Sequence, residues 1–195
     1  KKTIAYTMAH IFPEVVSALI SLLAALPSGL TAMQVLTIDL GTEMGPAISL
    51  AYEKAESDIM DRPPRDPKKY RLVSPTLLVY SYIISGAMLS GGSIAAYILI
   101  YRQNGILMSD FYRPDISYDK GGFFSLTTSE PVTVERTGVT WSVADQRQLF
   151  SRAATAFYIA LTVGQFSHVW VCKTRVNSLF THGFANKLMF YGVAV

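Results

Sequence analysis

Long apolar runs alternate with polar segments along this chain of 195 residues. A helix that crosses a bilayer needs about 20 mainly apolar residues, and the run from Leu77 to Tyr101 contains no charged residue at all. Pro27-Ser28-Gly29 breaks the chain between the first two runs, so we expect these two helices to form a hairpin. The pattern predicts an all-α, polytopic transmembrane helix bundle, with full spans at 4–27, 30–52, 76–101 and 148–172 and a truncated fifth span at 188–195.

The polar segments between these runs differ in charge. Segment 53–75 is dense in charged residues and holds four prolines, as is typical of a solvated loop. Lys and Arg are frequent before the first span, in 53–75 and in 173–187, whereas the longer segment 102–147 has more acidic than basic residues. The positive-inside rule therefore predicts that the three basic segments (before the first span, 53–75 and 173–187) are cytoplasmic and that 102–147 is an extracytoplasmic loop. Valine-rich runs such as 131–134 in that loop are compatible with brief strands.

Composition agrees with a membrane protein. Half of the residues are hydrophobic and 16% are charged, against about 25% charged residues in soluble proteins. The net charge of +3 is small and scattered, which argues against a nucleic-acid partner. The single Cys172 excludes a disulfide within the chain. Because the sequence starts at Lys1 without Met, ends at Val195 inside an apolar run and shows no secretory signal, we interpret it as a fragment.

Two carboxylates interrupt the second apolar run. Asp39 and Glu43 are four residues apart, so that on a helix they share one face. Because carboxylates at membrane depth are costly, they usually face a bundle interior and mark an ion or proton path. Gly41, Gly45 and Pro46 disfavour helix at the same place, which predicts a span that is unwound at a cation site. A kinked core helix in a soluble protein is the alternative.

A polar stripe follows the first span. Tyr6, His10 and Glu14 recur every four residues and therefore lie on one helix face. Pro13 cannot donate to the carbonyl of Ala9, which leaves that oxygen free as a ligand. The predicted hairpin brings this stripe beside the acidic pair. A glutamate next to a helix proline can also be only a packing defect.

Oxygen atoms gather in these two spans as in a site for a hard or weakly hydrated cation. The predicted cation ligands are Glu14, Asp39, Thr42 and Glu43. Gln165 and His168 share one face of the fourth span, and with Tyr6 and His10 they are candidates for a selectivity or proton role. The alternative for His168 is a core histidine bonded to a hydroxyl. His10, His168 and His182 make no zinc motif, and we find no nucleophile–base set, phosphate-binding loop or nucleic-acid motif.

Several sequence blocks carry a resemblance to a known family. They begin at Lys1 (KKTIAYT), Ile38 (IDLGTEM), Pro46 (PAISLAYEKAESDIM) and Cys172 (CKTR). The chain resembles the C-terminal membrane region of P-type cation ATPases, in the group of the sodium/potassium and gastric proton/potassium pump alpha subunits. The similarity covers the chain and is weakest between residues 102 and 146. It implies a chain that runs from the fifth transmembrane helix of the pump into the ninth.

The resemblance assigns roles to individual positions. Glu14 and Asp39 fall on cation ligands of the family, and Glu43 stands where the sodium/potassium pump has Asp. His168 replaces an Asp that helps to form the third sodium site. His10 occupies a position that is Ser in the sodium pump and Lys in the gastric pump. These departures put sodium/potassium stoichiometry in question.

His10 is therefore predicted to act as a titratable internal cation. Histidine changes its charge close to neutral pH, and the nearby carboxylates favour the protonated ring. Such a ring would fill space that a transported ion takes in sodium pumps. A neutral His10 that hydrogen-bonds Tyr6 or Glu14 is the alternative.

The implied function is cation binding and translocation in the membrane domain of an ATP-driven pump for Na⁺, K⁺ or H⁺. The catalytic domains and the fourth transmembrane helix are not in this sequence, so no catalytic residue or cofactor is assigned here and Mg-ATP belongs to the parent pump. Expected partners are these missing parts, the transported cations, the lipid of a plasma membrane and a β-type subunit. The subunit is expected near Gly138 and Trp141, which the loop keeps from the family pattern although the rest of that stretch is altered. Loop 53–75, with Arg62 and Arg65, is expected to dock the phosphorylation domain. A non-pumping scaffold or passive pore derived from such a pump is the alternative.

Overall fold

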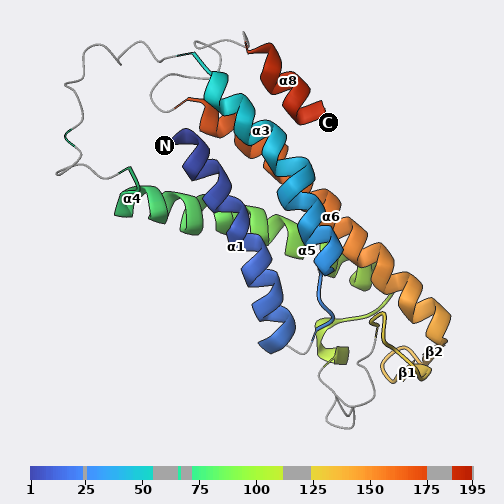
Figure 1. Cartoon of the computed structure of the whole chain (residues 1–195). Coiled ribbons are helices and arrows are strands. Elements are labelled where there is room, and N and C mark those ends of the chain that lie inside the picture. Colours follow the sequence, from blue (N-terminus) through green and yellow to red (C-terminus); the bar gives the residue numbers. More distant parts are fainter. Residues whose placement is uncertain (24–25, 55–65, 67–71, 112–123, 175–185, 195) are drawn as a thin grey trace. The chain divides into compact units, whose positions relative to one another are not determined.

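The computed structural model describes residues 1–23, 26–54, 66, 72–111, 124–174 and 186–194. These residues are mostly helical (Figure 1). In chain order the elements are α1 (Lys2–Leu23), α2 (Ala32–Thr37), η1 (Ile38–Glu43), α3 (Met44–Ser49), η2 (Leu50–Tyr52), α4 (Pro75–Leu78), η3 (Val79–Gly86), α5 (Ala87–Gln103), η4 (Met108–Phe111), β1 (Val132–Val134), β2 (Val139–Trp141), α6 (Val143–Lys173) and α8 (Lys187–Ala194). Of these, η1 and η3 are π-helices and η2 and η4 are 3₁₀-helices. The predictions for Arg62, Arg65 and His182 lie outside the described residues.

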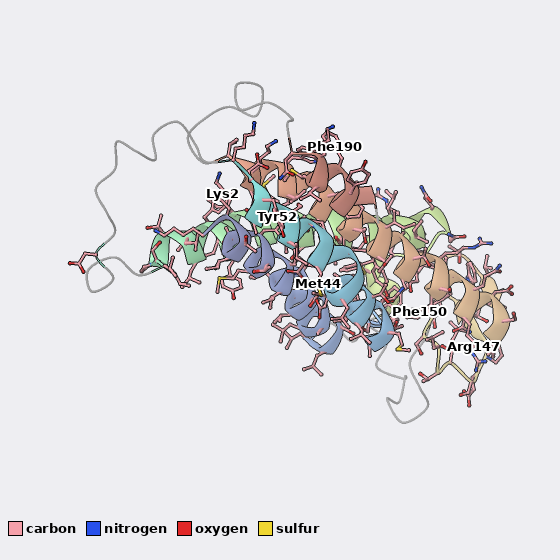
Figure 2. All side chains as sticks on the ribbon, turned by 45° about the horizontal axis from the view of Figure 1, so that its top comes forward. Lys2, Met44, Tyr52, Arg147, Phe150 and Phe190 are labelled. Atoms are coloured by element: carbon pink, nitrogen blue, oxygen red, sulfur yellow. The ribbon has the colours of Figure 1, made fainter. Side chains whose placement is uncertain are left out.

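The helices form two compact units, each described by itself. Unit 1 comprises Lys1–Pro13, Met33–Leu89 and Thr162–Val195, and unit 2 comprises Glu14–Ala32 and Ser90–Leu161. In unit 1, α8 lies beside α3, and Lys2, Tyr52 and Phe190 are found at the same end of the unit (Figure 2). The hydrophobic core of this unit is formed by Tyr6, Leu50, Val169, Cys172 and Met189.

Two helical stretches among the described residues are long and apolar enough to cross a membrane, namely Lys2–Leu23 and Pro75–Gln103. Together with the predominance of helix, they agree with an all-α membrane domain. The second predicted span, 30–52, consists of the short segments α2, η1, α3 and η2, whereas the fourth, 148–172, lies within the longer α6. Neither meets the same criterion, so the count of four full spans is not confirmed.

The segment with the acidic pair keeps a helical path. Thr37 and Met44, which flank η1, have helical backbone angles (φ −67°, ψ −36° and φ −63°, ψ −40°). The prediction of an unwound span is therefore wrong, because the chain is widened into a π-helix with bonds from residue i to i+5. Pro46 offers a physical reason, since it has no N–H for the carbonyl of Thr42 and its ring crowds the preceding turn. π-Helical turns inside longer helices occur often at functional sites.

Aromatic rings form much of the core of unit 2. Tyr97 and Tyr101 of α5 pack edge to face with centroids 5.1 Å apart, and Tyr101 packs in the same way on Phe111. Phe124 contacts Phe111 and also Trp141 of β2. Edge-to-face packing is a favourable arrangement of aromatic rings, so the loop that follows α5 is tied to the end of that helix.

A buried glutamine organises the short sheet that precedes α6. The side chain of Gln146 accepts a hydrogen bond from Phe124 N and donates to Glu130 O and Trp141 O. β1 pairs with β2 in antiparallel register, and Gly138 in the turn has φ +66°, which favours glycine. A strand at 131–134 was compatible with the sequence, whereas its pairing with β2 was not predicted.

Two glycines set the contact between α3 and α8. A Cβ atom added at Gly45 would lie 2.8 Å from the carbonyl oxygen of Gly192, and one added at Gly192 would lie 2.8 Å from that of Gly45. Cβ atoms do not approach backbone oxygen so closely without displacement of one helix. Small residues at membrane helix interfaces allow this kind of backbone approach.

Gly45→Ala is expected to destabilise the full-length protein by about 1–3 kcal/mol, as is usual for overpacking. The new methyl group would meet backbone atoms, which cannot rotate away. Gly91→Ala is the matched control, since an added Cβ there meets no atom within 4 Å and alanine favours a helix. Thermal unfolding of the detergent-solubilised protein measures both effects. Equal unfolding midpoints for wild type and Gly45→Ala would contradict the close contact.

Candidate cation site

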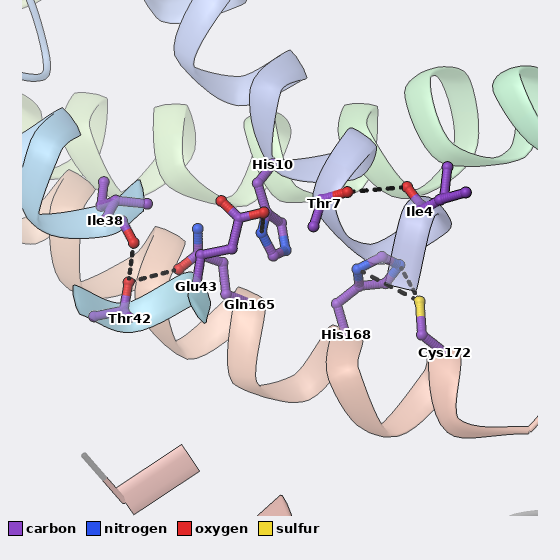
Figure 3. Close-up of polar contacts among 9 residues, drawn as sticks. All are labelled: Ile4, Thr7, His10, Ile38, Thr42, Glu43, Gln165, His168 and Cys172. Atoms are coloured by element: carbon purple, nitrogen blue, oxygen red, sulfur yellow. Dashed lines mark hydrogen bonds and ion pairs between the residues drawn. The ribbon is translucent and has the colours of Figure 1, made fainter. Parts of the chain in front are cut away.

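A histidine of α1 meets a glutamate of η1 inside unit 1. His10 Nδ1 lies 3.5 Å from Glu43 Oε1, and the two side chains are 0% and 13% exposed (Figure 3). The distance is longer than a normal N–H···O hydrogen bond, and the contact is an ion pair only when the imidazole is protonated. Neither ring nitrogen of His10 has a hydrogen-bond partner among the described residues. The ring is therefore a buried polar group whose Nδ1 faces the Glu43 carboxylate and whose Nε2 has no hydrogen-bond partner in the described part of the chain.

A second polar contact joins η1 to α6. Thr42 Oγ1 lies 3.1 Å from Ile38 O and 3.2 Å from Gln165 Oε1, so its one proton serves one acceptor at a time (Figure 3). Gln165 is fully buried, and its Nε2 has no hydrogen-bond partner in the described part of the chain. If the amide is turned over, Nε2 donates to Thr42 and Oε1 becomes the open atom, since amide orientation is assigned from the bonds it makes. In either orientation one amide atom of Gln165 stays available beside the helix that carries Glu43.

Aromatic and sulfur groups extend this polar region along α6. The ring of Tyr6 packs edge to face on His10 with centroids 4.2 Å apart, and it stacks on His168 at 5.9 Å. His168 Nε2 lies 3.3 Å from Cys172 Sγ (Figure 3). His168 is thus a buried histidine with a neighbouring partner, although that partner is a thiol rather than the hydroxyl considered from the sequence. Sequence reasoning missed this role of Cys172, which its spacing of four residues from His168 could have indicated.

The remaining predicted ligands are placed differently. Asp39 is exposed on η1, so the four-residue spacing does not bury it together with Glu43. Glu14 follows His10 by one turn of α1 but belongs to unit 2, and it is half-buried. In the part of the chain that the structure describes, no three His, Cys, Asp or Glu side chains are grouped so that they could hold a metal ion. Of the predicted cation ligands, Glu43 therefore contacts His10, and Thr42 contacts Gln165.

These features define a membrane protein with a polar site built from Glu, His, Thr and Gln side chains between apolar helices. The family model described as "Cation transporting ATPase, C-terminus" matches residues 27–195. The chain therefore belongs to the cation-transporting ATPase family, and it corresponds to the C-terminal region of a P-type pump. The resemblance inferred from the sequence blocks is confirmed.

Individual relatives agree with this assignment. The chain is 37% identical to "Sodium/potassium-transporting ATPase subunit alpha-3" of Gallus gallus over 193 residues. It is 37% and 38% identical to "Potassium-transporting ATPase alpha chain 2" of Rattus norvegicus and Oryctolagus cuniculus over 195 residues. These matches cover 99% to 100% of this chain and 17% to 18% of the relatives. The chain thus spans less than a fifth of the length of these relatives.

Proposed function

We propose that this chain is the cation-binding and translocating membrane domain of an ATP-driven pump for monovalent cations, Na⁺, K⁺ or H⁺. The observation that carries the proposal is the buried contact of His10 with Glu43, which lies within an apolar stretch of helices. Ionisable groups in such surroundings are costly and usually serve an ion or proton path. The names of the relatives, which specify sodium/potassium and potassium transport, support a monovalent cargo.

The polar groups around this contact offer a transported ion several kinds of ligand. Glu43 contributes charge and two oxygen atoms, and neutral polar groups come from Thr42 of the same helix and from Gln165 of α6. Hard cations bind carboxylate, carbonyl and hydroxyl oxygens. We assign Asp39 and Glu14 to the same cation path, where segments of the longer pump would complete the coordination. Tyr6, His10 and His168 would adjust selectivity or carry a proton.

Parts of the pump beyond this chain supply the remaining functions in this proposal. ATP hydrolysis, with Mg-ATP, belongs to catalytic domains elsewhere in the protein. Several large apolar side chains are strongly exposed, among them Leu22, Leu23 and Met88 at 77%, 79% and 74%, and they suit contact with lipid or with further transmembrane helices. The proposal also includes a plasma-membrane location and cytoplasmic loops 53–75 and 173–187. It further includes a β-type subunit that binds at the hairpin of Gly138 and Trp141.

Asp39→Asn tests the proposal in the full-length pump. The exposed Asp39 carboxylate of η1 would hold a cation together with a segment outside this chain, so we expect its loss to reduce apparent cation affinity at least about 10-fold, or about 1.4 kcal/mol. Cation-dependent phosphorylation and dephosphorylation are the measurements. Glu135→Gln, which removes an equally exposed acid from the sheet region, should leave both unchanged. Unaltered cation dependence in Asp39→Asn would remove this residue from the path, and a full-length protein without cation-stimulated ATP hydrolysis would favour the scaffold or pore.

A further inference from the structure

A buried ion pair lies in unit 1, away from the candidate cation site. Glu53 follows η2, and its Oε1 lies 3.5 Å from Nζ of Lys173 at the end of α6. The two side chains are 5% and 1% exposed. The other carboxylate oxygen of Glu53 accepts a hydrogen bond of 2.8 Å from Nδ2 of Asn186, the residue before α8. Glu53, Lys173 and Asn186 therefore form one buried polar cluster.

Further contacts tie this cluster to its surroundings. Asn186 Nδ2 also donates to the carbonyl oxygen of Ser49 at 3.0 Å, and Lys2 Nζ donates to that of Lys173 at 2.7 Å. The Lys173 ammonium lies 5.6 Å from the ring centre of Trp170, a distance at which a cation is attracted to an aromatic face. Segments from α1, η2, α6 and α8 thus meet at the end of unit 1 marked by Lys2 and Tyr52 (Figure 2).

The energetics of a buried ion pair favour a role in fixing the position of helices rather than in adding net stability. Two charges taken out of water lose hydration, so a buried pair adds little net stability over apolar residues of similar size. Removing one partner is different, because the remaining charge stays buried without the opposite charge of this pair. Glu53 and Lys173 therefore depend on each other, and the position of one constrains the position of the other.

The cluster is connected to the cation site by a continuous helical path. From Glu43 the chain passes through α3 and η2 without a break and leaves the helix at Glu53, where ψ is 140°. Ten helical residues span about 15 Å. At the other end lies the π-helix η1, whose turns are wider than those of α3. Glu43 is the last residue of η1 and directly precedes α3, so a shift or rotation of α3 would change the direction in which Glu43 points.

We propose that Glu53 and Lys173 are positioning residues, whose buried pair holds the end of this helix on α6 and α8 and thereby sets the cation affinity of the site around Glu43. This inference rests on the proposed function of that site. Neither Glu53 nor Lys173 touches the transported ion; each acts through the helix.

The test uses four variants of the full-length pump: Glu53→Gln, Lys173→Met, the double variant and the control Lys54→Met. Lys54 is exposed and adjacent to Glu53, so its loss changes charge at the same place without touching the cluster. Each single cluster variant is expected to weaken the apparent cation affinity about 5-fold or more, as is typical of coupled sites, with a smaller change in maximal ATP turnover. The double variant should lie closer to wild type than either single variant, because both opposite charges of the pair are then removed together. Lys54→Met should match wild type.

A purely structural role predicts another pattern. Yield and unfolding temperature would then fall in the single variants while the cation affinity of the folded fraction stayed at the wild-type value, and this result would overturn the proposal. If these single variants do not fold, Glu53→Asp decides, because it keeps the charge of the pair but shortens the side chain: folded protein with an altered cation affinity supports the proposal, and folded protein with wild-type affinity overturns it. If wild type shows cation-stimulated turnover and the single variants keep the wild-type cation affinity, only the positioning role is refuted. A wild type without cation-stimulated turnover would refute the proposed function as well.

Discussion

Replacing Glu43 by Gln in the full-length pump is expected to weaken the apparent affinity for the activating cation by at least about 30-fold. Loss of one charge from a buried pair typically costs about 2–5 kcal/mol, and each 1.4 kcal/mol is a factor of ten. The Glu43 carboxylate is 13% exposed and faces His10 at 3.5 Å, so a change of its charge acts directly on the site. ATP hydrolysis as a function of cation concentration measures the effect.

Glu43→Asp is the matched control for this experiment. It keeps the charge and removes one methylene, which gives the residue that the sodium/potassium pump is expected to have at this position. We therefore expect Glu43→Asp to keep its cation dependence within a few-fold of wild type. A Glu43→Gln variant with wild-type affinity would show that this carboxylate does not bind the ion.

The hydrophobic pattern predicted the helices better than their internal geometry. An apolar run such as Pro75–Gln103 has few alternatives to a helix, because every backbone polar group in lipid needs a partner within the segment. The same reasoning did not reveal that Val79–Gly86 and Ile38–Glu43 are π-helical. At Ile38–Glu43, glycine and proline indicated a break, and the structure accommodates the missing donor of Pro46 by widening the helix instead.

Contacts between distant segments were only partly accessible from the sequence. The spacing of Tyr6 and His10, together with the expected hairpin, predicted that His10 would lie beside the acidic pair, and in the structure His10 contacts Glu43 whereas Asp39 is exposed. Glu53 and Lys173 are 120 positions apart, and both were assigned to solvated loops because charged residues follow them. Their burial depends on how α6 and Asn186 pack at the end of η2. A periodic pattern within one segment cannot predict such packing between segments.

The surroundings of His10 suggest how its charge could affect transport. Its ring faces Glu43 from η1, Tyr6 from its own helix and His168 from α6. A positively charged side chain at position 10 would pair with the Glu43 carboxylate, 3.5 Å from His10 Nδ1. It would place a positive charge where a transported cation can otherwise bind. Charge movement per ATP should then depend on whether the residue at position 10 is charged.

His10→Ser and His10→Lys bracket this behaviour in the intact pump. We expect wild type to move fewer net charges per ATP than His10→Ser between pH 6 and pH 8, by up to about one elementary charge, because serine carries no charge that could replace a transported cation. His10→Lys, which places an ammonium group at this position, should give the lower charge ratio throughout. Simultaneous measurement of pump current and ATP hydrolysis provides the ratio. If wild type and His10→Ser share the same ratio and the same pH profile, His10 is a structural residue that packs against Tyr6 and Glu43 and does not replace a transported ion.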